Sequence, residues 1–310
     1  MRKLLARTLP WLVTAVILII LFRRIPLRDV VQAADNAAPW FIPATVLIVL
    51  VVYIADSLAI WKTFGWFVTQ LGFRETLILR GSTYLIALIN YSLGQGAFVY
   101  FLKKTRGVPM MRAAAAVLLI MGTNVLLLLF LSTLGLVLGA QSFPQLKTVL
   151  IVSYGGLAVY VALVALRPTI VTRWPVFDVL LEAGIGGHLK ATAVRVPHLI
   201  TLLTLNYVAL HAFGIPVPVL EVMLAMPVVF LIAVLPISFQ GLGPTQGAMI
   251  YFFARFAQGD SQHRSAQVLA ASLGAQAIAW VVQISVGLVC TRSQLGKTMR
   301  ATAKEIPAES

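Results

Sequence analysis

Long apolar segments with few charged residues limit most strongly what this chain can fold into. A bilayer has a hydrocarbon core about 30 Å thick, so a helix needs about 20 mostly apolar residues to cross it. Six segments predict complete transmembrane helices: Leu4–Phe22, Trp40–Trp61, Ala113–Gly139, Leu146–Leu166, Val196–Ile215 and Ser265–Thr291. The whole chain agrees, because 60% of its 310 residues are hydrophobic and 11% are charged. We predict a single all-α polytopic membrane domain over residues 1–310.

Two further apolar regions are interrupted by glycine, proline and polar residues. The region Glu75–Leu102 contains "NYSLGQG", and the region Val219–Phe256 contains "LPISFQGLGPTQG". Such residues end helices, and backbone groups freed inside a bilayer must find protein or water partners. We therefore expect two re-entrant hairpins, each made of two half-helices around a break. Two ordinary helices joined by a short turn are the alternative for each region.

The two interrupted regions share a short sequence motif. "QGAFVYFLKKTRG" starts at Gln95 and "QGAMIYFFARFAQG" starts at Gln246. An internal duplication explains the match, with repeat one at 1–145 and repeat two at 146–310. Each half has the order span, span, hairpin, span, and the predicted topology inserts the halves in opposite directions. Inverted repeats with broken helices are typical of transporters.

Basic residues set the predicted orientation. The chain has 24 Lys and Arg against 10 Asp and Glu, and most of the basic residues lie beside apolar segments. Because cytoplasmic loops are enriched in Lys and Arg, we expect the N-terminus, the loop 167–195 and the tail 292–310 to be cytoplasmic. Arg23, Arg24 and Arg28 conflict with this topology, since they would lie outside. No nucleic-acid motif accompanies the positive charge, so we expect membrane lipids as partners.

The two breaks together form the candidate binding site. Glycines allow close backbone approach, and half-helices starting near Gly96 and Pro244 would point positive dipole ends at a ligand. These groups suit a phosphate-bearing or zwitterionic headgroup. The predicted substrate-binding residues are Arg80, Asn90, Gly94, Gln95, Gly96, Ser238, Gln240, Gly241, Gly243, Gln246 and Gly247. The alternative is that these residues only pack and satisfy the hairpin backbones.

Several charged residues flank these breaks. Lys103, Lys104, Arg112 and Arg264 are expected to bind headgroup phosphates or to lie at the membrane interface. Asp56 is the one carboxylate well inside a predicted complete span. It pairs with Arg80 or Lys62, or else carries a proton for coupling. No metal-ligand cluster, cofactor motif or catalytic motif is present, so we expect neither a metal site nor a cofactor, and we do not expect an enzyme.

Both interrupted stretches resemble a known family. "LPISFQGLGPTQGAMIYFFARFAQG" resembles the signature of the lysylphosphatidylglycerol synthase transmembrane-region family, a flippase-like group of membrane proteins. That family's second break reads roughly Pro-x-Ser-x-x-Gly-x-Gly, which Pro236, Ser238, Gly241 and Gly243 match. "NYSLGQGAFVYFLKKTRGVP" is similar to the family's earlier break and the basic step after it. Gln246 stands where the family commonly has Glu, which argues against carboxylate-dependent recognition of a cationic headgroup.

The resemblance implies movement of lipids or lipid-linked molecules between leaflets. With no aminoacyl-transfer domain, this sequence resembles the stand-alone members of the family. The leading hypothesis is a flippase or scramblase of the bacterial inner membrane, acting on anionic or polyprenyl-linked lipids. The alternatives are a membrane subunit that scaffolds a lipid-modifying enzyme, a proton-coupled small-solute transporter, and an intramembrane enzyme acting on a polyprenyl phosphate. A second copy of the chain also remains open as a partner.

Overall fold

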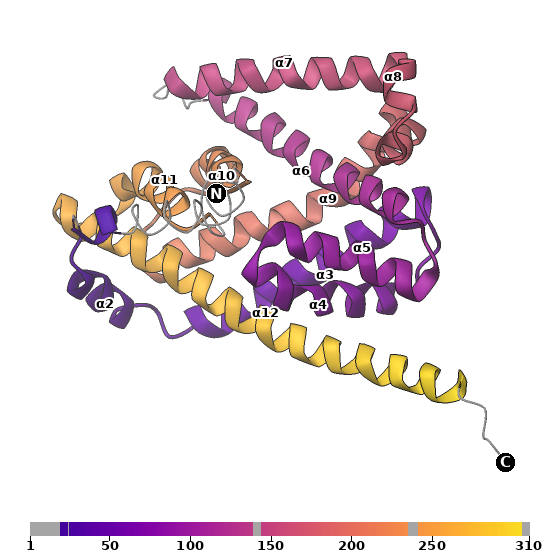
Figure 1. Cartoon of the computed structure of the whole chain (residues 1–310). Coiled ribbons are helices and arrows are strands. Elements are labelled where there is room, and N and C mark those ends of the chain that lie inside the picture. The colour runs from indigo at the N-terminus through magenta and orange to yellow at the C-terminus, as the bar shows by residue number, and fades with distance from the viewer. Residues whose placement is uncertain (1–18, 24, 139–143, 235–240, 306–310) are drawn as a thin grey trace, which may run out of the picture.

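The computed structural model describes residues 19–23, 25–138, 144–234 and 241–305 (Figure 1). Throughout these residues the regular structure is helical, which confirms the predicted all-α class. Four described helices are long and apolar enough to cross a membrane: Phe41–Phe67, Met110–Gly135, Pro175–Ala212 and Ser261–Ser293. Leu150–Leu166 and Val219–Ala233 are shorter apolar helices. The predicted first span, Leu4–Phe22, lies almost wholly outside the described residues.

The described helices follow one another with short connections. They are α2 (Leu27–Asp35), α3 (Phe41–Phe67), α4 (Phe73–Ile89), α5 (Tyr91–Arg106), α6 (Met110–Leu138), α7 (Pro144–Leu166), α8 (Thr169–Thr172), η1 (Pro175–Phe177), α9 (Asp178–Ala212), α10 (Val219–Val234), α11 (Pro244–Phe253), η3 (Ala254–Phe256) and α12 (Ser261–Glu305). The core of the bundle is made by α3 and α6 against α9, and by α4 against α5 and α12. In Figure 1, α7 lies away from this core and is joined to it through α6 and α9.

The largest difference from the sequence prediction is the expected loop 167–195. Most of it is helical, because α9 begins at Asp178 and continues through Pro197 to Ala212. Asp178 lies in the first turn, where a carboxylate favours the positive end of a helix. A kink at Gly184, with φ 54°, lets the chain change direction inside this segment. Consequently Arg195 is a helix residue and not a loop residue.

The first interrupted region forms a helical hairpin, α4–α5, that turns at Asn90. Asn90 has an extended backbone, and its side chain accepts a hydrogen bond from the Leu93 amide (3.0 Å), as an N-cap does. Gly107, with φ 65°, ends α5 in the left-handed conformation that glycine favours. With 17 and 16 residues, α4 and α5 are each about 25 Å long, which is shorter than the hydrocarbon core.

The second interrupted region also contains two packed helices, α10 and α11. Residues 235–240 of its break lie outside the described part of the chain. Gly241 and Gly243 have φ values of 74° and 93°, which side-chain-bearing residues rarely adopt. Pro244 then occupies the first turn of α11, where its missing N–H costs nothing.

The two hairpins have their open ends toward opposite ends of α12. Gly81 of α4 lies against Cys290, and Leu85 lies against Gly287, so α4 runs antiparallel to the later part of α12. The start of α4 therefore faces the C-terminal end of α12. In contrast, η3 ends only a short loop before Ser261 and packs against α12. The arrangement agrees with hairpins inserted from opposite sides, although the inverted repeat itself stays a prediction.

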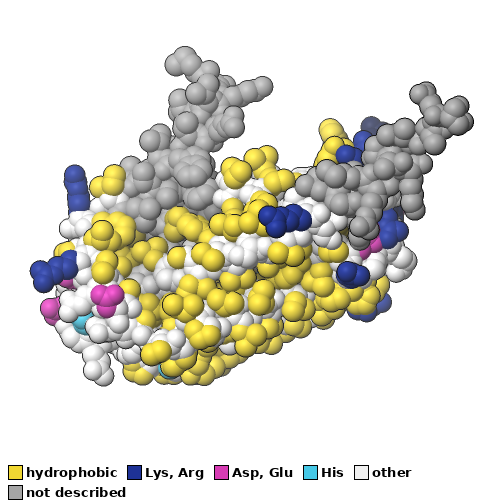
Figure 2. Space-filling view, turned by 90° about the horizontal axis from the view of Figure 1, so that it is seen from below, with side chains coloured by type: hydrophobic (Ala, Val, Ile, Leu, Met, Phe, Trp, Pro, Cys, Tyr) yellow, Lys and Arg dark blue, Asp and Glu magenta, His cyan; other side chains and the backbone are white. Residues whose placement is uncertain are grey.

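The surface of the molecule is largely apolar. Figure 2 shows a face covered by hydrophobic side chains, with the visible Lys, Arg, Asp and Glu side chains mostly toward its ends. Large hydrophobic side chains such as Leu47, Phe130 and Val289 are more than 60% exposed. An apolar surface of this extent suits contact with lipid better than contact with water.

Two neighbouring glycines of α5 test the packing of the first hairpin. A Cβ at Gly94 would lie 2.5 Å from the Cβ of Ala87 in α4, whereas a Cβ at Gly96 would meet nothing within 4 Å. We expect Gly94→Ala to force α4 and α5 apart and to destabilise the protein by about 1–3 kcal/mol. Gly96→Ala, the matched control, should leave the melting temperature in detergent unchanged or slightly higher. Equal melting temperatures for the two variants would contradict the close helix contact.

Candidate functional site

A cluster of three buried charges links α3, α4 and α9. Asp56 accepts hydrogen bonds from Nε of Arg80 (2.6 Å, at Oδ2) and from a terminal nitrogen of Arg195 (2.5 Å, at Oδ1). The exposed fractions are 3% for Asp56, 8% for Arg80 and 7% for Arg195. Each residue lies about halfway along its helix. A charge at this depth is costly and usually marks a pathway or an ion pair.

The two arginines outnumber the one carboxylate in this cluster. Tyr84 lies beside Arg80, whose guanidinium carbon is 5.4 Å from the ring centroid. Nδ1 of His198 lies 3.4 Å from the Val52 carbonyl oxygen, one turn from Asp56. Among the described residues, Nε of Arg195 is buried and has no hydrogen-bond acceptor. The cluster therefore carries one excess positive charge and at least one unused donor.

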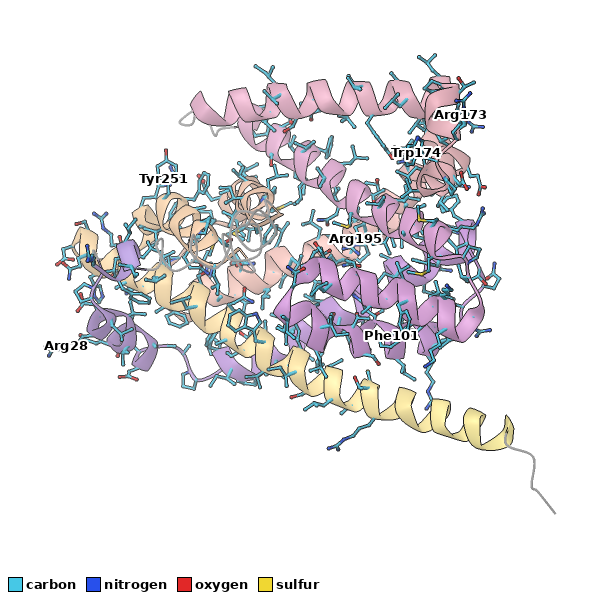
Figure 3. The ribbon with its side chains drawn as sticks, in the orientation of Figure 1. Arg28, Phe101, Arg173, Trp174, Arg195 and Tyr251 are labelled. Carbon is cyan, nitrogen blue, oxygen red and sulfur yellow. The ribbon has the colours of Figure 1, made fainter. Side chains whose placement is uncertain are left out.

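Figure 3 shows how the helices position these groups. Arg195 projects into the interior of the bundle from α9, whereas Arg28 and Arg173 lie at its periphery. The α3–α9 pair is among the most extensive helix contacts of the structure, so Asp56 and Arg195 face each other across a well-packed interface. Arg80 comes from α4, the first half of the α4–α5 hairpin.

The first predicted break lies at the exposed tip of its hairpin. Asn90 and Gly96 are exposed and Gln95 is half-buried. Gly94 is buried against Ala87 of α4, so the close approach it permits is to a neighbouring helix. The structure thus brings only Arg80 of the first predicted group into the buried cluster.

The second predicted break is only partly described. Ser238 and Gln240 lie outside the described residues, and Gly247 is half-buried. Gln246 is 2% exposed, and its carbonyl oxygen accepts a hydrogen bond from the Gly243 amide (2.7 Å). This contact holds the first turn of α11 together. In the structure Gln246 therefore serves the hairpin backbone, which was the alternative interpretation of these residues.

An ion pair closes the open end of each hairpin. Arg106 at the end of α5 donates to Glu75 in the first turn of α4 (Nε to Oε1, 2.7 Å), and its terminal nitrogen also contacts this carboxylate. These hydrogen bonds raise the pKa of the Arg106 guanidinium above its ordinary value. In the second hairpin Arg255 donates to Glu221 of α10 (2.7 Å). Each hairpin therefore has an ion pair between its two ends.

The flanking basic residues lie in different surroundings. Lys103 and Lys104 are exposed in the last turn of α5, where cations favour the helix dipole. Arg112 donates to both carboxylate oxygens of Glu182 (2.9 and 2.7 Å) and to the Phe67 carbonyl. Arg264 is half-buried, and its Nε has no acceptor among the described residues.

A cavity of about 190 Å³ lies between α6, α7 and α9. Apart from Tyr160, His188 and Thr192, its lining is aliphatic. Nε2 of His188 forms a hydrogen bond with the Tyr160 hydroxyl (2.6 Å). Its Nδ1 lies 2.6 Å from the Gly184 carbonyl oxygen at the kink of α9. The apolar lining suits hydrocarbon rather than a charged group.

The model of the lysylphosphatidylglycerol synthase TM region family matches residues 8–287. The chain belongs to this family. The match confirms the resemblance of the two interrupted stretches and, with the membrane-length helices, makes the chain an integral membrane protein. Searches of curated proteins and of solved structures found no match.

Sequence reasoning missed Arg195 as a site residue. Its neighbourhood, "HLKATAVRVPHL", is basic, which favours a loop beside the expected span Val196–Ile215. One signal was present: no glycine or proline separates Gly187 from Arg195, so a helix can extend back across it. Arg195 and His198 are then three residues apart and share a helix face.

The charge balance of the cluster predicts an order of stability among three variants. Asp56→Asn leaves two buried guanidinium groups without a counter-charge and should cost about 3–5 kcal/mol. Arg80→Gln leaves Asp56 and Arg195 as a neutral pair, so we expect a loss less than half as large. Glu221→Gln breaks an exposed pair, worth about 0–1 kcal/mol. Thermal unfolding in detergent measures the order, and an Arg80→Gln variant less stable than Asp56→Asn would contradict it.

Proposed function

We propose that this protein moves lipid headgroups between the leaflets of a bacterial inner membrane, as a flippase or scramblase. The observation that carries the proposal is the cluster of Asp56, Arg80 and Arg195 at mid-depth in the helices. A polar headgroup cannot cross hydrocarbon unaided, because its desolvation costs several kcal/mol. Buried charges halfway along the helices supply a partner for it where water is absent.

The first hairpin gives the headgroup a route toward this cluster. Its exposed tip carries the first turn of α5, which Asn90 caps, and the exposed side chain of Tyr91. We place the headgroup path along this hairpin, with Gln95 and Gly96 at its entrance and acyl chains outside in lipid. The apolar cavity between α6, α7 and α9 supports a place for one acyl chain. Rocking of one repeat against the other would expose the path to each leaflet in turn.

Charge at the two ends of the bundle supports the proposed orientation. Near the open end of the first hairpin lie Lys103, Lys104, Arg106 and Arg112 with Glu75 and Glu182. Near the open end of the second lie Arg28, Arg255 and Arg264 with Asp29, Glu221 and Asp260. By the positive-inside rule this difference supports a cytoplasmic location of the first end, and we propose that both termini are cytoplasmic.

Cysteine labelling tests the opposed hairpins and this orientation together. Lys104→Cys and Asp260→Cys are both at exposed positions, and Cys290→Ala provides a background without the buried native thiol. We expect a membrane-impermeant maleimide to label Asp260→Cys in spheroplasts, and Lys104→Cys only after permeabilisation. Labelling of both positions from the same side would contradict the proposed topology.

Leaflet exchange in proteoliposomes tests the function. Purified protein is reconstituted with trace fluorescent phosphatidylglycerol, lysyl-phosphatidylglycerol or a polyprenyl phosphate, and dithionite quenches the outer leaflet. Vesicles without protein should lose only the outer-leaflet signal. We expect the protein to expose the inner-leaflet signal for one headgroup class, because the buried cluster provides a polar path.

Matched variants locate the path. Arg80→Gln and Gln95→Ala should slow exchange at least tenfold, whereas Arg28→Gln, an equivalent change at an exposed arginine far from the cluster, should not. Folding of each variant is checked by its melting temperature. No exchange of any lipid by folded protein would overturn the proposal and favour a subunit that scaffolds a lipid-modifying enzyme.

A further inference from the structure

We infer that Arg80 and Arg195 form a binding site for a phosphate anion, and that Asp56 occupies this site while the ligand is absent. The inference names the ligand chemistry of the path proposed above and rests on that proposed function. It assigns Arg195 a direct role in binding, and it assigns Asp56 the role of an internal competitor.

The charge count is the first argument. Two guanidinium groups face one carboxylate, and all three residues are more than nine-tenths buried. Among the described residues, the other ionisable side chains nearest the cluster are Tyr53, Tyr84, Tyr91 and His198, and neither tyrosine nor histidine adds negative charge near pH 7. An excess buried cation is costly, so a second anion entering the cluster would be favoured electrostatically.

Hydrogen bonding is the second argument. A guanidinium group has five N–H donors in a planar fork that matches carboxylate and phosphate oxygens. Arg195 uses one terminal nitrogen on Asp56, while its Nε is buried with no acceptor among the described residues. A phosphate offers more acceptor oxygens than one carboxylate and can satisfy this donor. A purely structural ion pair would leave no buried donor unsatisfied. The unused Nε donor of Arg195 therefore indicates an anion site that is only partly filled by Asp56.

The separate helices of the cluster are the third argument. Asp56 comes from α3, Arg80 from α4 and Arg195 from α9, so a ligand that displaces Asp56 changes the connection between three elements. Because α4 belongs to the first hairpin, binding would be coupled to the hairpin. When phosphate replaces the Asp56 carboxylate, both arginines keep an anionic partner. This lowers the free-energy cost of moving the headgroup past the cluster.

Ligand-induced stabilisation of the purified protein tests the site. The melting temperature in uncharged detergent is followed with short-chain phosphatidylglycerol, with inorganic phosphate and with short-chain diacylglycerol as the ligand without phosphate. A ligand that binds only the folded state raises the melting temperature, and the rise grows with the logarithm of the ligand concentration above its Kd. We expect phosphatidylglycerol to do so and diacylglycerol not to. A rise with inorganic phosphate of equal size would identify free phosphate as the source of the anion, and a rise with the lipid alone would identify the headgroup.

Variants of the cluster give the decisive comparison. Arg195→Gln keeps a neutral Asp56–Arg80 pair, so it should fold, yet bind phosphatidylglycerol about tenfold to a hundredfold more weakly. Arg195→Lys keeps the positive charge but lacks the planar guanidinium fork. Its affinity for phosphatidylglycerol should lie between those of the native protein and Arg195→Gln. Asp56→Asn removes the competitor and should bind more tightly than the native protein. Arg28→Gln is the control and should match the native response.

Three results would overturn the inference. They are the absence of stabilisation of the native protein by a phosphate-bearing ligand, an unchanged response of Arg195→Gln, and weaker binding by a folded Asp56→Asn protein. If Asp56→Asn does not fold, the arginine variants decide alone. The same preparations are assayed for leaflet exchange: exchange that persists without phosphate-dependent stabilisation would contradict the anion site only, whereas stabilisation without exchange would contradict the transport function only.

Discussion

A charge inside a membrane-embedded helix bundle requires a partner, because neither lipid nor apolar side chains can solvate it. In this protein the requirement is met by Asp56, which joins Arg80 and Arg195 and so ties α3, α4 and α9 together. Both oxygens of this carboxylate are used, one for each arginine. The charge balance of the cluster is incomplete, however, and this excess of positive charge links the packing of the bundle to the proposed movement of phosphate-bearing lipids.

Small residues determine how the hairpins can lie around this cluster. Without a Cβ at Gly94, α5 can approach Ala87 of α4, and Gly81 permits α4 to approach Cys290 of α12. Close approach of helices through small residues is a common solution in membranes, where no hydrophobic force favours helix contact over lipid contact. The ion pairs Glu75–Arg106 and Glu221–Arg255 then close the open ends of the two hairpins. Each hairpin thus has its two ends joined by an ion pair.

Much of the fold could be predicted because its signals are local. Apolar runs form α3 and α6, and each run is a property of neighbouring residues. The break at Asn90 and the turn at Gly107 also depend on residues close together in the chain. The predicted site was harder, because its parts come from distant segments. Sequence reasoning names Arg80 as one of two candidate partners of Asp56, but it places Arg195 in a loop, and it cannot show that Gln246 accepts a hydrogen bond from the Gly243 amide. Hydropathy failed at Arg195 because a basic residue lowers the local average, whatever its partner in space.

The membrane class, the helical fold, the two interrupted regions and the family follow from the amino-acid sequence, because apolar length, helix breakers and short motifs are properties of neighbouring residues. Which charges are buried together, and which glycines serve helix contacts, depends on the packing of segments that are distant in the chain. Asp56 and Arg195 are separated by more than a hundred residues, and no local pattern encodes their distance. Their meeting results from the packing of α3 on α9, where the cost of burying a charge selects the partner that can neutralise it.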